Sequence, residues 1–415
     1  MYMENIDTLW FYLEPYTFIS EDFEYFFFYN TNSQRGMSFQ KDKNISEIVK
    51  ELQNPDKLYS VRIDVRDLED EHLYNFVRTI QTSEFGDIIE GELPKPLIMP
   101  PTLNLQYSVE RLKKHNTSIS DNILSYLHEV AIFINGECLL NCEGCQNEFK
   151  QHLCCTKSEN ILDLTLLKNF LFTISYTGAS ITILGGNIFR YAELRELLNI
   201  LRRVNSMHTF ITNWRNIPEN PEVLNLLSHE LFRLKIVINK MYQVDFMVAL
   251  ARKIKRNNIA QLWEVSITSI SEYEKAEILS QQLANLNINV NIKPIYNGEN
   301  RSFFERYIYI DEEDIDKMEL DRQGVFSLQE LNTNDFGKIT ILSDGKVYAN
   351  VNKEPIGDIK DSIGEMLCKE LESGISWRRT RYKTEPCDQC RFKLICPSPS
   401  NYELVMGKTN LCHIR

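Results

Sequence analysis

Six short apolar segments alternate with amphipathic helical segments between residues 130 and 296, and this alternation constrains the fold most. The apolar segments are residues 130–135, 180–186, 208–213, 234–239, 263–268 and 288–296. Helical spacing of apolar residues marks 164–175, 191–204 and 245–256 between them. Strands separated by helices form parallel βα units whose helices cover the sheet. The sequence therefore predicts an α/β fold with its functional residues at the carboxyl ends of the strands.

The flanking regions have different patterns. Aromatic runs at 13–20 and 25–30, followed by helical stretches at 45–54 and 70–81, predict three strands and two helices. We interpret residues 1–93 as a small winged-helix-like domain and the proline-rich 94–129 as a linker and helix. The α/β region is assigned to 130–335. Residues 336–415 begin with a hairpin through Asp344-Gly345 and end in a cysteine-rich tail.

Charge and hydropathy exclude several partners. The net charge is −12, which argues against nucleic-acid binding because that requires a cationic surface. The first residues lack the basic and apolar regions of a secretory signal, and no apolar run approaches the ~18–20 residues that span a membrane. We expect a soluble, cytoplasmic protein that does not bind membranes.

Nine of the ten cysteines fall into two groups. One group lies at positions 138, 142, 145, 154 and 155, and the other at 387, 390, 396 and 412; Cys368 stands alone. In a cytoplasmic chain such cysteines are interpreted as thiols or metal ligands before disulfides.

Cys138, Cys142 and Cys145 have the spacing C-x3-C-x2-C directly after the first strand of the series. Gly136 and Gly144 permit the tight curvature that would bring the three thiolates together. Three thiolates suit a [4Fe–4S] cluster in which one iron has no protein ligand. A zinc site or unrelated thiols are the alternatives.

This motif after the first strand resembles the radical S-adenosylmethionine (SAM) superfamily. The resemblance implies a partial (β/α)6 barrel, SAM bound to the open iron, and a 5′-deoxyadenosyl radical that abstracts a substrate hydrogen. It also implies that Gly185, Gly186 and Asn187 hold the methionine end, although the family has Glu where Asn187 stands. An amide binds an ammonium less strongly than a carboxylate does. Gly144 stands where the family has an aromatic residue.

Further positions follow from the strand ends. Thr212 and Asn213 end the third strand and Ser266 and Thr268 lie in the fifth, where they would contact the nucleoside part of SAM or act as caps. Cys154-Cys155 would serve a second cluster or pack as buried thiols.

The tail carries a second set of candidate ligands: Cys387, Cys390, Cys396 and Cys412. Four thiols can fully ligate one [4Fe–4S] cluster or one zinc ion. The stretch from ILSDGKVYA through PIGDIKD to CDQC resembles the SPASM or twitch auxiliary-cluster extension of radical peptide maturases. Asn350 stands where the full form has a cysteine, so we expect one auxiliary cluster.

The whole chain resembles the pseudo-radical-SAM proteins of Bacteroidales Gly-Gly leader peptide systems. This resemblance rests on the segments WFYLEPYTFIS, YLHEVAIFINGECLLNC and CPSPSNYELVMGKTNLC. The resemblance implies a radical SAM peptide maturase whose partners are a ribosomal precursor peptide with a Gly-Gly leader, held by residues 1–93, and a reductant such as ferredoxin or flavodoxin. Two alternatives stay open: a SAM-impaired protein that presents the peptide to another enzyme, and a zinc-stabilised interaction protein.

Overall fold

The computed structural model describes residues 7–102, 110–111, 114, 123–142, 144–239 and 242–414. Its main feature is a nine-stranded sheet in the order β12-β11-β10-β9-β8-β7-β13-β14-β15. The strands β7 to β12 pair in parallel, which confirms the six predicted strands. Their bounds are Glu129–Asn135, Ser180–Gly185, His208–Asn213, Phe232–Asn239, Ala260–Ile267 and Val290–Pro294.

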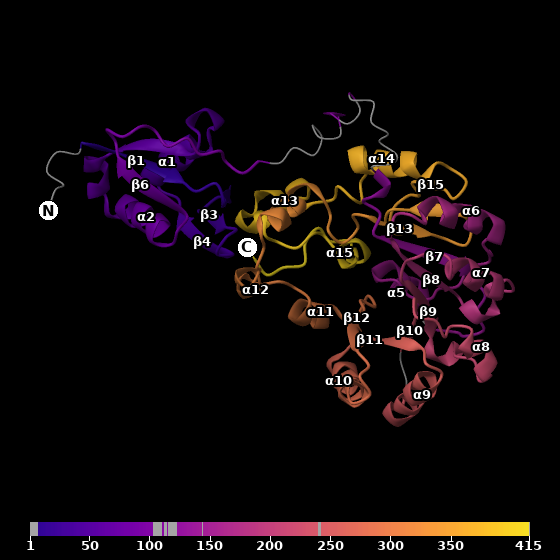
Figure 1. The fold of residues 1–415 in the computed structure, drawn as a ribbon. Helices are drawn as coiled ribbons and strands as arrows, with labels where there is room; N and C mark the ends of the chain where they lie inside the picture. The colour runs from indigo at the N-terminus through magenta and orange to yellow at the C-terminus, as the bar shows by residue number, and fades with distance from the viewer. Residues whose placement is uncertain are drawn as a thin grey trace.

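Helices cover one face of this sheet, as Figure 1 shows for α6, α7 and α8. They are α6 (Leu164–Ile174), α7 (Leu194–Leu201), α8 (Pro221–Asn225), α9 (Val244–Arg256) and α10 (Ile270–Ala284). The side chains of Asp163 and Ser269 cap α6 and α10 by accepting backbone N–H bonds. Alternate strand residues such as Val130, Ile132 and Ile134 pack under the helices. We call the opposite face, which carries Ala131, Phe133, Leu184, Ile211 and Val237, the inner face.

The predicted hairpin is β13 (Lys338–Ile341) and β14 (Lys346–Tyr348), followed by β15 (Gly357–Asp358). Because β13 pairs in parallel with β7, the hairpin extends the large sheet. Between β12 and β13 lie α11 (Arg301–Tyr307), α12 (Glu312–Asp316) and α13 (Arg322–Glu330). The tail contains α14 (Ile363–Ser373), α15 (Asn401–Met406) and the short turns η5 (Arg381–Lys383), η6 (Cys387–Gln389) and η7 (Arg391–Leu394).

The N-terminal region, which we call the N-terminal module (residues 7–93), has six strands where three were predicted. They form two antiparallel sheets, β5-β1-β6 and β2-β3-β4. Their bounds are Thr8–Leu13, Thr17–Glu21, Tyr25–Asn30, Arg35–Gln40, Ser60–Asp64 and Gly86–Glu90. The predicted single strand 13–20 is wrong: a turn at Pro15-Tyr16, closed by a Thr17 N–H to Glu14 carbonyl bond of 3.0 Å, separates β1 from β2.

The two helices predicted for this module are confirmed as α1 (Lys43–Gln53) and α2 (Glu71–Thr82). Aromatic rings from β1, β3 and α2 meet edge to face in its core, with Phe76 5.8 Å from Phe11 and 5.7 Å from Phe28. Its winged-helix-like character and the domain bounds stay predictions. In Figure 1 the module lies beside α12 and α13, away from β7 to β12. No helix in the described ranges is long and apolar enough to cross a membrane.

Candidate metal and cofactor sites

The loop after β7 carries Cys138, Cys142 and Cys145, which we call the central thiols. The three lie close enough for their charges to interact. Burial raises the pKa of Cys142, a hydrogen bond from Asn239 opposes this, and Cys138 and Cys145 raise it further. Cys145 begins α5 (Cys145–Gln151) after Gly144, whose φ of +79° is left-handed and favours glycine. The backbone therefore gives a reason for Gly144 where the superfamily that the cysteine motif resembles has an aromatic residue.

Gly185 and Gly186 pack against the backbone of this loop. A Cβ at Gly185 would lie 2.3 Å from the carbonyl oxygen of Asn135, and one at Gly186 would lie 2.4 Å from that of Glu137. From the sequence, we expected the absence of these Cβ atoms to allow the close approach of a ligand. In the structure, the absence of these Cβ atoms allows the segment at the end of β8 to contact the loop that bears the central thiols.

Asn187 fastens the same contact. Its backbone N–H donates to the Glu137 carbonyl at 2.7 Å, and its carbonyl accepts from the Asn135 amide at 3.0 Å. Its side-chain oxygen accepts the Phe189 N–H at 3.0 Å and so caps the short helix η3 (Ile188–Arg190). The Asn187 side chain thus serves the local backbone.

Asn216, which the sequence analysis missed, lies between the two segments. Its amide nitrogen is 3.7 Å from the Cys138 sulfur and 3.4 Å from the Gly186 carbonyl oxygen. It ends η4 (Trp214–Asn216), which Asn213 caps by accepting the Arg215 N–H at 3.0 Å. The charge of Arg215 also lowers the pKa of Cys142. An Asn cap followed three residues later by a second Asn is the only sequence signal for this contact.

Thr212 and Asn213 lie on opposite faces of β9. Asn213 is fully buried on the inner face with Ile211, and its amide donates to the Asn239 side chain at 2.6 Å. Thr212, also fully buried, shares the helix-covered face with Phe210. Asn239 in turn bonds Cys142 and lies 3.5 Å from Glu148. Of the two predicted residues, Asn213 is the one connected to the central thiols.

Ser266 and Thr268 also differ in their surroundings. Ser266 is buried on β11, and its hydroxyl has no hydrogen-bond partner in the described part of the chain. A buried orphan of this kind fits a polar ligand. The Thr268 hydroxyl donates to the Glu272 carboxylate at 2.8 Å, so it secures the first turn of α10. Asn135 Oδ1 and Thr156 Oγ1 are likewise buried without a partner among the residues described.

Cys154 and Cys155 follow α5 and are both buried. Cys154 packs on the inner face among Ala131, Phe133 and Val237. Burial, together with the charges of the central thiols, raises the pKa of Cys155 to about 12. Without a metal, its side chain is therefore a neutral thiol at physiological pH.

Cys387, Cys390, Cys396 and Cys412, which we call the terminal thiols, line one cavity of about 420 Å³. Burial raises the pKa of Cys396 to about 12, although the charge of Arg381 opposes this. Arg381 lies 3.7 Å from the Cys387 sulfur and forms a buried ion pair with Glu403 at 2.7 Å. The four predicted ligands are thus gathered, beside a cation that favours thiolates.

Asn350, where the full extension has a cysteine, is buried in a polar network. Its amide donates to the Asp335 carboxylate at 3.0 Å and to Asn401 at 2.7 Å. Over the described residues, no group of three or more His, Cys, Asp or Glu side chains is placed to hold a metal ion. The fit to iron–sulfur clusters therefore rests on the donor chemistry, the neighbouring thiols and the buried polar orphans.

No family model matches the chain, and no curated protein is similar to it in sequence. Among solved structures it is similar to SuiB of Streptococcus suis, with 15% identity over 97% of this chain and all of SuiB, and a TM-score of 0.51. SuiB bound to its precursor peptide SuiA gives 14% identity, 93% and 94% coverage and a TM-score of 0.48. SuiB bound to S-adenosylmethionine gives 15% identity, 92% coverage of this chain, 94% coverage of SuiB and a TM-score of 0.44. At this identity the likeness shows the fold: mixed α/β with a large parallel sheet.

Proposed function

We propose that the chain is a radical SAM enzyme that modifies a ribosomally synthesised precursor peptide. The observation that carries the proposal is the set of central thiols at the carboxyl end of β7, with Gly186 and Asn216 against their loop. The fold shared with SuiB, which has been solved with S-adenosylmethionine and with a precursor peptide, supports it. When bound, the cluster and SAM supply a 5′-deoxyadenosyl radical that abstracts a hydrogen atom from the peptide.

The residues around the central thiols have separable tasks in this proposal. Cys138, Cys142 and Cys145 hold the cluster. The Asn239 hydrogen bond and the Arg215 charge favour the thiolate of Cys142, because both lower its pKa. Gly185, Gly186 and Asn187 fix the loop and present its backbone to the methionine end.

Two residues on the inner face would bind the nucleoside end. Ser266 brings a buried hydroxyl without a partner in the described chain, and Asn213 brings an amide already oriented by Asn239. Thr212 and Thr268 would act near the cofactor only indirectly. Thr212 is buried within β9, and the Thr268 hydroxyl bonds Glu272 in the first turn of α10.

The terminal thiols would hold one auxiliary [4Fe–4S] cluster. Four protein ligands leave no iron open, so this centre would transfer electrons or stabilise the fold. Ferredoxin or flavodoxin would supply the electrons for the cluster on the central thiols.

The N-terminal module would bind the leader, which we propose to be of the Gly-Gly type, by adding a strand at β4. In the sheet β2-β3-β4 the β2 strand packs against η7, whereas β4 is the opposite edge and is largely exposed. A cavity of about 420 Å³ lies between the end of β4 and α2, lined by Phe39, Ile45, His72 and Phe76 among others. Strand addition would supply backbone hydrogen bonds, and the cavity would select a side chain.

A second candidate function is a SAM-impaired protein that presents the peptide to another enzyme. Asn187 favours it, because the side-chain oxygen at the position of the family's Glu already caps η3. In this case the clusters would maintain the fold.

Anaerobic cleavage of SAM separates the candidates. The full chain, reconstituted with iron and sulfide, is incubated with SAM and dithionite, and 5′-deoxyadenosine is measured with and without a candidate precursor peptide. Formation by the intact chain and none by Cys142→Ala supports the enzyme. No product from protein that contains iron and acid-labile sulfide, with peptide present, supports the presenting protein. Zinc without labile sulfide in anaerobically purified protein eliminates both and leaves the interaction protein.

A further inference from the structure

The loop between two of the terminal thiols forms much of the surface on which the N-terminal module rests. Between Cys390 and Cys396 lie five residues, and three of them, Phe392, Leu394 and Ile395, are buried in one apolar group with Phe18 and Phe27 of the module. The rings of Phe27 and Phe392 are 5.1 Å apart, edge to face. The module therefore contacts the loop whose ends are predicted metal ligands.

Arg391 adds ionic contacts from the same loop. Its guanidinium bonds Asp22 of the module at 2.7 Å and Glu312 of α12 at 2.9 Å, and its side chain is only 12% exposed. It lies 4.8 Å from the ring centroid of Tyr25, and its carbonyl accepts a hydrogen bond from the Ser20 hydroxyl. Because this ion pair is partly desolvated, it stabilises the contact only when both partners are held in the right geometry.

The second half of the surface is also joined to a terminal thiol. Tyr29 of the module bonds the backbone of Leu320, and Ile315 and Val325 pack in the same apolar group. The segment that leads into α12 pairs with the chain at Cys412: Ile310 N–H donates to the Leu411 carbonyl at 3.1 Å, and His413 N–H donates to the Ile310 carbonyl at 2.9 Å. Both halves of the surface are thus held next to terminal thiols.

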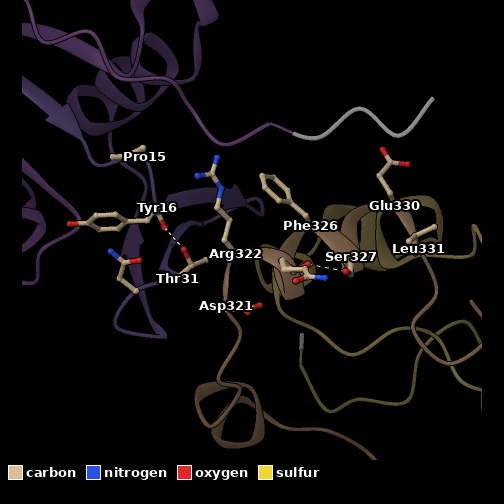
Figure 2. Close-up of a pocket in the computed structure, with 11 residues that line it drawn as sticks. Pro15, Tyr16, Thr31, Asp321, Arg322, Phe326, Ser327, Glu330 and Leu331 are labelled. Carbon is tan, nitrogen blue, oxygen red and sulfur yellow. Dashed lines mark hydrogen bonds between the residues drawn. The ribbon is translucent and has the colours of Figure 1, made fainter. Parts of the chain in front are cut away.

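The contact between the module and the rest of the chain is incomplete elsewhere. A cavity of about 780 Å³ lies between Pro15, Tyr16 and Thr31 of the module and Arg322 of α13, and Phe326 at its edge packs edge to face on Phe18 at 5.3 Å. Figure 2 shows the Tyr16 and Thr31 side chains on one side of it and Arg322 and Phe326 on the other. The turn Asp22–Glu24 instead reaches the cavity of the terminal thiols and lines it. Docking consequently depends on the surface around those thiols.

We propose that the metal centre on the terminal thiols shapes the docking surface of the N-terminal module, so that a chain without this centre releases the module. Metal ligation fixes Cys390, Cys396 and Cys412 at once, and binding that requires the folded loop stabilises it by linkage. The proposal rests on the proposed function only in taking the terminal thiols as metal ligands. It adds that this centre controls where the leader-binding module lies.

Hydrogen–deuterium exchange of the full chain, kept anaerobic and without SAM or peptide, tests the proposal. We expect Cys390→Ala to raise exchange in residues 17–30 and 315–326 by at least about tenfold, because the β2-β3 hairpin loses the apolar packing of the loop and the Leu320 N–H loses its Tyr29 partner. Cys142→Ala is the matched control, because it removes a predicted ligand of the other centre, and exchange in both segments should equal that of the intact chain.

Arg391→Ala keeps all four thiols and tests the contact if Cys390→Ala perturbs the tail more widely. We expect increased exchange at 17–30 with unchanged metal content. Lys393→Ala is its control, since the Lys393 amine bonds the Asp388 carbonyl within the tail at 2.7 Å. Equal exchange at 17–30 in Cys390→Ala and Cys142→Ala, or in Arg391→Ala and Lys393→Ala, overturns the proposal. Hydrogen–deuterium exchange does not depend on SAM cleavage, so a chain that does not cleave SAM can still confirm this proposal about the terminal thiols.

Discussion

The two cysteine sites differ in how many thiols they gather and in what surrounds them. The central thiols number three and are contacted by neutral amides, Asn216 at Cys138 and Asn239 at Cys142. The terminal thiols number four, share one cavity and lie beside the buried Arg381–Glu403 pair. Three ligands leave one iron of a [4Fe–4S] cluster open to SAM, whereas four close it. Under the proposed function, this difference would separate a site for SAM chemistry from one that supports structure or electron transfer.

The largest expected effect is that of Cys142→Ala. Formation of 5′-deoxyadenosine should fall below detection, because the cluster loses a ligand. Iron content should fall from roughly eight to roughly four per chain, as one of two [4Fe–4S] clusters is lost. The measurements are product analysis and iron assay after anaerobic reconstitution. Cys368→Ala, outside both groups, is the control; a Cys142→Ala chain with full activity would contradict the assignment of the central site.

Glu403→Ala should destabilise the terminal site by about 3–5 kcal/mol, because it leaves the buried Arg381 cation unpaired. It also removes the carboxylate that accepts the Ser400 N–H at the start of α15. Thermal unfolding monitored at the iron–sulfur absorbance measures the effect. Glu305→Ala breaks the exposed Arg301–Glu305 pair and should change the melting temperature much less. Equal shifts would mean that the buried pair does not hold the terminal site.

The network at Asn350 should make stability depend on pH. Burial raises the pKa of Asp335 to about 6 from 3.8, despite the Asn350 hydrogen bond. The folded chain therefore binds this proton more tightly than the unfolded chain, so the Asp335 contribution to stability falls as pH rises from about 4 to about 6. The difference is on the order of 3 kcal/mol.

Denaturant unfolding at pH 4, 5, 6 and 7 tests this, with Asp335→Asn as the comparison. The substituted chain should lose that part of the pH dependence. Parallel stability curves for the two chains would show that folding does not raise the pKa of Asp335.

The smallest expected effect is that of Asn216→Ala at the central site. Loss of an N–H···S contact lowers the reduction potential of a cluster, and loss of such an outer contact typically costs about 10- to 100-fold in metal affinity or activity. EPR-monitored redox titration and the rate of SAM cleavage measure it. Asn199→Ala is the control, because the Asn199 side chain on α7 accepts a hydrogen bond from Arg202, away from the central thiols. An unchanged potential would indicate that Asn216 only supports Gly186.

Much of the large sheet could be predicted from the sequence, because buried parallel strands are nearly continuous apolar runs. The hairpin through Asp344-Gly345 and the helices α1 and α2 were predicted for similar local reasons. The N-terminal strands were undercounted, because β4 and parts of β5 and β6 are half exposed and lack an apolar run. Asn216 was missed because its contacts join segments 78 and 30 residues apart.

The sequence alone determined the order of the strands β7 to β12 and the two sets of thiols, since local periodicity and cysteine spacing are properties of neighbouring residues. Only the tertiary structure decided that Gly186 touches the Glu137 backbone, that β13 joins β7, and that Arg391 meets Asp22. Such contacts depend on how distant segments pack, and no short stretch of sequence contains that information.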